Sequence, residues 1–212
     1  SSVPLGDYRR VDLRSLRVAW YTSNGELDPT PEIQKAVGDC ASLMTAAGAK
    51  VAEARPPSLK ETVETTRKLL GADGGAGTQR RVRKAGTKQT SPQLGLGSGA
   101  PVPSPEFGTL VEKLDECRSQ MLAFLDDYDI ILCPPSARPA PRIGEPPGPP
   151  GWNYTWVYNA TGWPAAVVRA GTSPEGLPLG IQIVGRPWTD HVVLAVAAHI
   201  ESKTGGWQRP AI

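Results

Sequence analysis

The chain has 212 residues and a formal net charge of +2, from 23 lysines and arginines against 21 aspartates and glutamates. Hydrophobic residues make up 39% of the chain and charged residues 21%, a composition typical of a globular protein with a buried core. A net charge so close to zero argues against a large positive surface, so we expect no nucleic-acid partner. The apolar stretches fall far short of the roughly 20 residues that a membrane-spanning helix needs, so we expect no membrane span.

Glycine and proline are abundant, with 23 and 22 residues, and they predict long connections between the regular elements. Two long Gly/Pro-rich loops are expected, over residues 71–105 and 134–152. No composition shift marks a second domain, so residues 1–212 are interpreted as one portion of a single domain.

The three cysteines indicate a reducing compartment. Cys40, Cys117 and Cys133 are odd in number, widely spaced and embedded in apolar segments, which favours buried, reduced thiols over a disulfide framework. The first residues show no basic region followed by an apolar core, so no secretory signal is expected. Both observations predict a cytoplasmic protein.

The first elements in chain order are a strand, a helix and a strand. Residues 16–21 form a short apolar run that ends at a Ser-Asn-Gly turn, and residues 50–54 form a second run. Between them, Thr30 is expected to cap a helix that begins at Pro31 and ends at Gly48. This order predicts a right-handed parallel crossover.

Two further helices and a buried strand follow. Residues 58–70 place acidic side chains early and basic side chains late, as a helix dipole prefers. From Glu106 to Leu125, apolar residues recur at helical spacing, so this is the most strongly predicted helix. Residues 129–133 are almost wholly apolar, which predicts a strand buried on both faces.

The last part of the chain predicts a hairpin and a helix. The strands 165–169 and 179–184 are joined by a turn at 171–176, so an antiparallel hairpin is expected. Residues 189–203 are nearly apolar all round and predict a buried helix. We therefore expect an α/β fold with a mixed sheet and helices on both faces.

Metal and cofactor chemistry have no support in the residue spacing. His191 and His199 are the only histidines and lie eight residues apart, and no Cys-x-x-Cys pair exists, so neither a metal nor another cofactor is expected. The basic run from Arg80 to Lys88 is interpreted as a solvated face.

Aromatic residues are the most informative chemical feature. Four of them fall within residues 152–158, and Trp163 and Trp188 follow. Aromatic side chains with a few polar groups line many apolar ligand sites, but the same residues also fill ordinary cores. Both interpretations stay open on composition alone.

Several segments together resemble the amidase signature family, in its general amidase and fatty-acid-amide-hydrolase-like branch. They are Tyr128-Asp129-Ile130-Ile131-Leu132-Cys133-Pro134-Pro135, Tyr158-Asn159-Ala160-Thr161-Gly162-Trp163-Pro164, Gly176-Leu177-Pro178-Leu179-Gly180-Ile181-Gln182-Ile183-Val184-Gly185, and Trp188-Thr189-Asp190 before a closing helix. Ala72-Asp73-Gly74-Gly75 and residues 13–57 add to the resemblance. It covers most of the chain.

The resemblance implies hydrolysis of carboxamides to acid and amine through an acyl-enzyme. In that family a lysine, a serine in a cis peptide and a nucleophilic serine act together, and the two serines lie in a Gly/Ser-rich motif that forms the oxyanion hole. A desolvated, neutral lysine can serve as the base, so the low histidine count is no objection. The chain holds no Gly-Gly-Ser-Ser-Gly-Gly stretch, and its adjacent serines, Ser1 and Ser2, are followed by Val3-Pro4.

We therefore expect no catalytic residue in this chain, which resembles the C-terminal half of such an enzyme and should be inactive alone. Lys113 and Ser136 are interpreted as ordinary surface or loop residues. The expected partners are a small-molecule amide and the missing N-terminal half, with a homodimer possible. By the resemblance, this half supplies the sheet core and the wall of the acyl pocket. The residues expected to contact substrate are Trp156, Asn159, Thr161, Trp163 and Trp188.

Three other interpretations stay open. The protein can be a catalytically dead amide-binding protein that keeps the pocket, a subunit of an aminoacyl-tRNA transamidase from the same family, or a structural domain without a pocket.

Overall fold

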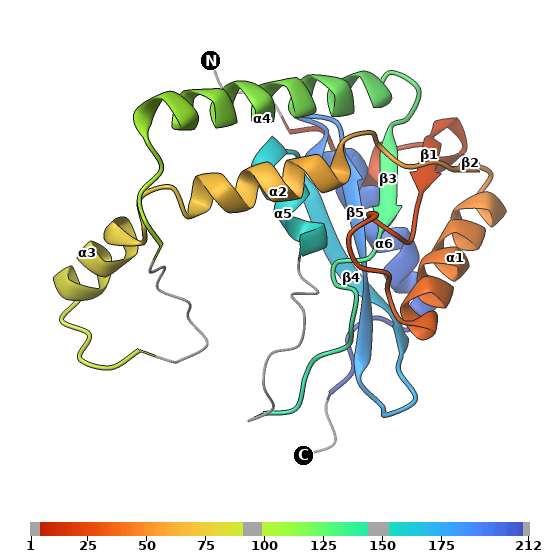
Figure 1. Ribbon diagram of the computed structural model, residues 1–212. Coiled ribbons are helices and arrows are strands. Elements are labelled where there is room, and N and C mark those ends of the chain that lie inside the picture. The colour runs from red at the N-terminus through yellow and green to blue at the C-terminus, as the bar shows by residue number, and fades with distance from the viewer. Residues whose placement is uncertain (1–4, 91–98, 144–152, 210–212) are drawn as a thin grey trace.

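The computed structural model describes residues 5–90, 99–143 and 153–209, and it contains a five-stranded mixed sheet with strand order β2-β1-β3-β5-β4 (Figure 1). The strands β2, β1 and β3 are parallel, whereas β5 runs antiparallel to both β3 and β4. The expected α/β class, with a mixed sheet and a C-terminal hairpin, is confirmed. The strands are β1 (Arg17–Trp20), β2 (Lys50–Glu53), β3 (Ile130–Cys133), β4 (Ala165–Thr172) and β5 (Pro178–Gly185).

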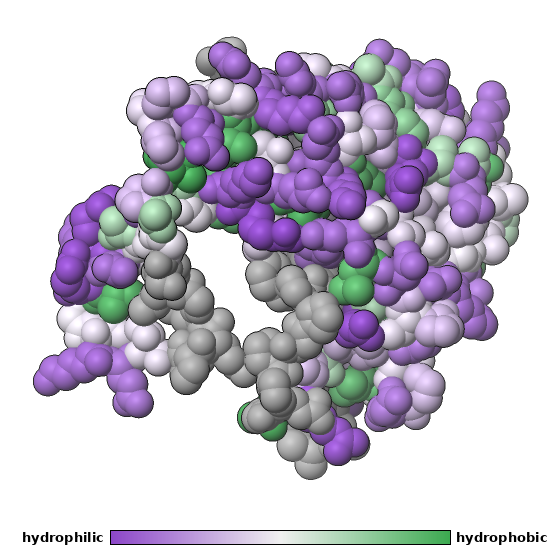
Figure 2. Space-filling model, viewed as in Figure 1, coloured by the Kyte–Doolittle hydropathy of each residue, from purple (hydrophilic) through white to green (hydrophobic). Residues whose placement is uncertain are grey.

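Helices cover both faces of the sheet, as the sequence predicts. One face packs against α1 (Pro31–Ala46) and α6 (Asp190–Thr204). The other face carries α5 (Asn153–Thr161) and an outer pair of helices that lie side by side in Figure 1, α2 (Leu59–Leu70) and α4 (Ser104–Phe124). Figure 2 shows that the surface over this outer pair is mostly hydrophilic, as expected of a layer that faces solvent. The remaining helices are α3 (Ala76–Lys84) and the short 3-10 turns η1 (Tyr8–Arg10) and η2 (Leu13–Ser15).

The strands divide the core into two clusters because successive side chains point to opposite faces. In β1, Val18 packs toward α1 and α6, and Ala19 packs toward α2 and α5. In β3, Ile130 and Ile131 divide in the same way, and all four residues of this strand are buried. This confirms the prediction of a strand buried on both faces.

Residues at both ends of helix α1 match the start and stop signals in the sequence. Pro31 occupies the first turn, as expected, and Gly48 adopts φ +92° just after the helix. Thr30 occupies the N-cap position, as predicted, but its hydroxyl makes no capping hydrogen bond. Instead its carbonyl oxygen accepts from Ile33 N and Gln34 N, both at 3.0 Å.

Two expectations about regular structure need correction. Residues 71–105, expected as a long surface loop with room for one short helix, contain the helix α3 and also the first two residues of α4. The aromatic segment, for which the sequence predicts no regular element, forms α5 from residue 153 onward. Helix α6 is not buried all round, because Leu194 is 51% exposed while Val193 and Val196 face the sheet. Residues 144–152 of the expected second loop lie outside the described residues, and residues 134–143 contain no helix or strand.

Candidate substrate-binding wall around α5

Helix α5 carries most of the predicted site residues and has two different sides. Tyr154, Val157 and Tyr158, at helical spacing, are buried against the sheet. Trp156 is half-buried at the edge of this cluster, whereas Asn159 is exposed. The helix therefore presents an anchored side and an accessible side that holds Trp156 and Asn159.

Trp156 lies beside one end of a chain of charged and polar side chains. The Arg67 guanidinium of α2 lies over its ring at 6.0 Å from the centroid and donates to Glu26 Oε1 at 2.6 Å. Glu26 Oε2 in turn accepts from Asn153 Nδ2 at 2.6 Å. Glu26 thus links α2 to the start of α5, and Arg67 holds the tryptophan ring. No sequence pattern indicates this link, since its members are separated by up to 127 residues.

Beneath α5, two pairs of buried polar side chains bond to each other. The hydroxyls of Tyr21 and Tyr158 lie 3.0 Å apart, and Gln182 Nε2 donates to Cys133 Sγ at 3.2 Å. Burial raises the pKa of both tyrosines well above the ordinary value and that of Cys133 to about 11. These groups therefore stay protonated at neutral pH and serve as internal hydrogen-bond partners.

The end of α5 is fixed by side chains from its own last turn and from α4. Thr161 Oγ1 donates to Tyr158 O at 3.1 Å, and Arg118 Nε donates to Ala160 O at 2.8 Å. The bond from Arg118 satisfies a carbonyl group at the helix end, whereas Tyr158 O also accepts from Gly162 N at 2.9 Å. The hydroxyl of the predicted contact residue Thr161 is thus bonded within its own helix.

Trp163 and Trp188 occupy different environments near one end of the sheet. Trp163 is only 9% exposed, and its ring centroid lies 6.3 Å from that of Tyr158. Gly185 N donates to Pro164 O at 3.0 Å, so the segment after Trp163 lies against the end of β5, three residues before Trp188. Trp188 is 71% exposed and has φ +67°, an uncommon conformation for a residue with a side chain.

The structure thus brings Trp156 and Trp163 to the same hydrophobic core cluster, and it leaves Asn159 and Trp188 exposed. None of the predicted residues lines either of the two hollows that adjoin α2.

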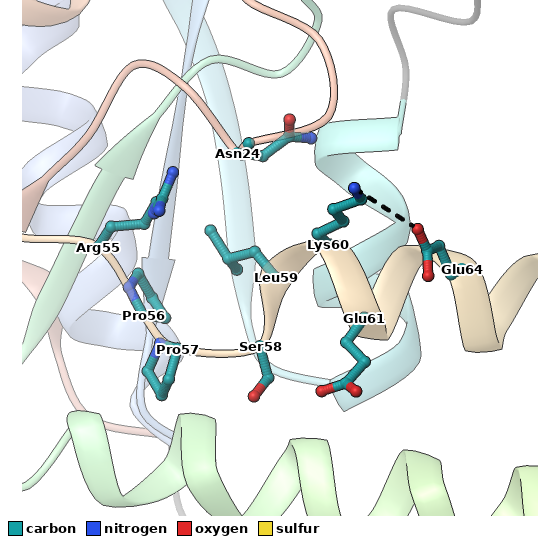
Figure 3. Close-up of a pocket in the computed structure, with 10 residues that line it drawn as sticks. Asn24, Arg55, Pro56, Pro57, Ser58, Leu59, Lys60, Glu61 and Glu64 are labelled. Carbon is teal, nitrogen blue, oxygen red and sulfur yellow. Dashed lines mark ion pairs between the residues drawn. The ribbon is translucent and has the colours of Figure 1, made fainter.

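The first hollow lies where the connection from β2 enters α2, with a volume of about 560 Å³ (Figure 3). Its charged side chains are of both signs, and Lys60 Nζ lies 4.0 Å from Glu64 Oε1. Ser58, with φ +60°, forms the entry to α2. The Pro-Pro pair before that helix is the sequence signal for this sharp entry. The lining residues are Asn24, Gly25, Arg55, Pro56, Pro57, Ser58, Leu59, Lys60, Glu61 and Glu64.

The second hollow, of about 440 Å³, lies between the end of α2, α3 and the start of α4. Asp73 is part of its lining, and its carboxylate accepts from Gly75 N at 2.8 Å and from Gly77 N at 2.6 Å. These bonds hold the pKa of Asp73 below its ordinary value. The Ala72-Asp73-Gly74-Gly75 element therefore has a structural role, because it starts α3.

The three cysteines, Lys113 and Ser136 show no sign of activation as a nucleophile or base. Burial raises the pKa of Cys40 to about 12 and also raises that of Cys117. Lys113 forms an ion pair with Glu61 at 2.9 Å, which raises its pKa and keeps it charged. Ser136 Oγ donates to Arg138 O at 2.8 Å within a turn. Lys113 and Ser136 are thus both engaged in local contacts.

Among the described residues, no group of three or more His, Cys, Asp or Glu side chains is placed to hold a metal ion. Within the same residues, no helix is both long enough and apolar enough to cross a membrane.

Comparison with known families agrees with this architecture. The profile of the family described as "Amidase" matches residues 6–194, which is most of the chain. The chain belongs to the amidase family. Human fatty-acid amide hydrolase 2 is 37% identical over 97 residues, which make up 45% of this chain and 18% of the relative. A glutamyl-tRNA(Gln) amidotransferase subunit of Acidobacterium capsulatum is 32% identical over 239 aligned positions, 95% of this chain and 49% of the relative.

Solved amidase structures show the same fold. A fatty acid amide hydrolase structure superimposes with a TM-score of 0.76 at 23% identity, over 92% of this chain and 41% of that one. A 6-aminohexanoate cyclic dimer hydrolase gives a TM-score of 0.76 at 21% identity, over 99% of this chain and 50% of that one. The chain therefore spans about half, or less, of the length of these amidase relatives.

Proposed function

We propose that this chain is the substrate-wall portion of an amide hydrolase that converts a carboxylic amide and water to an acid and an amine. The observation that carries the proposal is the amidase match over residues 6–194, on a sheet whose α5 side holds the half-buried Trp156 and the buried Trp163 in one hydrophobic cluster. Aromatic walls of this kind suit an apolar acyl group.

The chemistry requires a nucleophile, which we place outside residues 1–212 because these residues hold no Gly-Gly-Ser-Ser-Gly-Gly stretch. By the family resemblance, a serine Oγ outside residues 1–212 attacks the amide carbonyl, and its proton passes through a second serine to a neutral lysine. The tetrahedral oxyanion is held by backbone N–H groups, the C–N bond then breaks, and the departing amine takes the proton back. Water hydrolyses the acyl-enzyme ester and restores the serine.

In this scheme the residues of this chain bind and orient the acyl group. Trp156 supplies the apolar surface, and Arg67 and Glu26 hold its ring in place. Asn159 and Trp188 are exposed and free of packing against the described core, so they can contact a substrate at the junction with the rest of the enzyme.

The test is hydrolysis of anilides with acyl chains of increasing length by the natural protein, with Trp156→Ala and Trp207→Ala compared. Trp207 is 77% exposed near the end of the chain and serves as the matched control. We expect Trp156→Ala to lower kcat/KM for long acyl chains by about 10-fold, close to the contribution of a few buried methylenes, and Trp207→Ala to have no effect. Failure of the natural protein to cleave any anilide would contradict the proposed function.

A second candidate is a subunit of an aminoacyl-tRNA transamidase, because the Acidobacterium capsulatum relative bears such a name and aligns with 95% of the chain. Partner subunits and RNA that co-purify with the natural protein would favour it. A catalytically dead amide-binding protein is the third: it would be stabilised by amides in a thermal melt without hydrolysing them.

A further inference from the structure

We propose that the hollow at the entry to α2 binds a small oxyanion, through a carboxylate or a phosphate group. The hollow lies beyond the carboxyl ends of β1 and β2, the edge of a parallel sheet at which ligands bind in α/β folds. Its volume of about 560 Å³ is within the range of small-molecule sites. Binding of this kind goes beyond the proposed function, since it needs no amide hydrolysis.

The first turn of α2 offers backbone N–H groups without acceptors. Leu59, Lys60 and Glu61 are its first residues, and a helix leaves such N–H groups without a partner inside the helix. Ser58, at the N-cap position, makes no capping hydrogen bond, and its hydroxyl donates to Gln120 Oε1. In the part of the chain that the structure describes, no acceptor bonds these three N–H groups. Unpaired N–H groups at a helix N-terminus favour a negatively charged ligand.

A buried side-chain donor of this hollow also lacks an acceptor. Asn24 lines the hollow and is only 2% exposed, and its Nδ2 has no hydrogen-bond partner among the described residues. Its Oδ1 accepts from Glu26 N at 3.0 Å and from Leu27 N at 3.3 Å, so the orientation of the amide is fixed and Nδ2 stays a donor. Figure 3 shows this nitrogen on the side of the hollow where Lys60 lies. A buried donor without a partner is costly, and a bound oxyanion would supply its acceptor.

The charged side chains around the hollow leave a cation available. The Arg55 guanidinium donates through Nη1 to Ser23 O at 3.2 Å, and it forms no ion pair with another described residue. Of the two acidic side chains in the lining, Glu61 is paired with a lysine of α4 at 2.9 Å. Glu64 lies 4.0 Å from Lys60 Nζ, at the limit of an ion pair between exposed side chains. The remaining N–H groups of Arg55 can therefore bind two oxygens of a carboxylate or phosphate.

Carboxylate and phosphate groups share what these donors require, a negative charge and at least two acceptor oxygens. A hollow that holds only water is one competing case. Adventitious binding of anions to the basic run on α3, which includes Arg80 and Arg81, is the other. The three cases are separated by titration with two anions and by charge-removing variants at both places.

The first experiment is titration calorimetry of the natural protein with inorganic phosphate and, separately, with succinate, in a buffer that contains neither anion. We expect saturable binding of at least one probe, with a Kd below about 10 mM. The probe with the lower Kd identifies the recognised group as phosphate or carboxylate. If neither probe binds saturably, the hollow holds only water and the inference is overturned.

The second experiment repeats the titration on variants at exposed sites, where substitution leaves the core intact. Arg55→Gln should weaken binding of the better probe by about 10-fold, because it removes the available cation. Glu64→Gln removes a repelling charge and should strengthen binding by about 3-fold. Arg81→Gln, on α3, is the matched control and should have no effect. An affinity that falls with Arg81→Gln but not with Arg55→Gln would overturn the inference in favour of adventitious binding.

The third variant tests the buried donor. Asn24→Asp keeps an oxygen that accepts from Glu26 N and Leu27 N, but it replaces the unpaired donor by a second oxygen. We expect binding to weaken by at least about 10-fold in a variant that still melts cooperatively. Unchanged affinity in that variant would overturn the inference. If the variant does not fold, the comparison of Arg55→Gln with Arg81→Gln decides alone.

Discussion

Glu26 Oε2 accepts a hydrogen bond from Asn153 Nδ2 at 2.6 Å, and this contact joins the connection after β1 to the first residue of α5. The other carboxylate oxygen pairs with Arg67, which lies over the Trp156 ring. One acidic side chain therefore fixes both the start of the helix and the position of its half-buried aromatic residue.

Glu26→Ala is expected to destabilise the protein by about 1–3 kcal/mol, because the buried Asn153 amide loses its acceptor. The measurement is urea unfolding of the natural protein followed by tryptophan fluorescence. Asp39→Ala is the control, since Asp39 belongs to an exposed i,i+4 pair with Lys35 and should cost well under 1 kcal/mol. Equal losses for the two variants would show that the link does not stabilise α5.

The buried hydroxyl pair of Tyr21 and Tyr158 predicts coupling between two substitutions. Either single change to phenylalanine takes a hydrogen-bond partner from the remaining hydroxyl and should cost about 1–3 kcal/mol. The double variant should lose less than the sum of the single losses, by at least about 0.5 kcal/mol. The free energies of unfolding are measured for the unsubstituted protein, the two single variants and the double variant. Additive losses would contradict the hydrogen bond between the two hydroxyls.

Alanine substitutions at Gly74 and Gly86 distinguish the cost of backbone strain from the cost of a steric clash. Both have positive φ, +61° and +65°, so alanine at either site is expected to cost about 1 kcal/mol. At Gly74 an added Cβ would also lie 2.5 Å from Gly99 O, while nothing lies within 4 Å at Gly86. Gly74→Ala should therefore lower Tm clearly more than Gly86→Ala. A larger loss of Tm for Gly86→Ala than for Gly74→Ala would contradict the close approach of Gly74 to Gly99 O.

The Arg17–Asp129 pair predicts a pH dependence of stability. Partial burial favours a raised pKa for Asp129, but the hydrogen bonds from the Arg17 side chain and backbone outweigh it and hold that pKa below its ordinary value. The stabilisation is thus present above the unfolded-state pKa of about 3.9 and lost as pH falls through the lower folded-state pKa. Asp129→Asn should lower Tm by about 2–4 °C at pH 7, and the difference from the unsubstituted protein should vanish at low pH. Asp127→Asn, at an exposed neighbouring site, is the control. A Tm difference between Asp129→Asn and the unsubstituted protein that stays the same at low pH would contradict the stabilising role of the Arg17–Asp129 pair.

Trp188, exposed with a positive φ, is predicted to contact the acyl group in the assembled enzyme. Trp188→Ala should change the ratio of kcat/KM between long and short acyl anilides by about 3–10-fold, with Trp207→Ala as the exposed control. A ratio that Trp188→Ala leaves unchanged would remove Trp188 from the substrate wall.

The elements predicted from sequence are those with a strong local pattern. Strand β3 follows from its apolar run, and α1 follows from Pro31 and its periodic apolar residues. Helix α5 could not be predicted in this way, because tryptophan, tyrosine, valine and threonine have modest helix propensity. Packing of Tyr154 and Tyr158 against the sheet decides its conformation.

The candidate site also combines features that a local sequence pattern predicts with features that it does not. The aromatic content around α5 is visible in the sequence, and so are Trp156 and Trp163. The link from Arg67 through Glu26 to Asn153 depends on contacts between residues 41 and 127 positions apart, which no local pattern encodes. The hollows lie between elements that meet only in the folded chain.

The measurement that tests the central claim most directly is labelling of the natural protein with a serine-reactive fluorophosphonate, followed by peptide mapping. We predict one labelled serine, in a Gly/Ser-rich peptide outside residues 1–212, and loss of amide hydrolysis in proportion to labelling. A labelled residue within 1–212, or amide hydrolysis that survives complete labelling, would contradict the account.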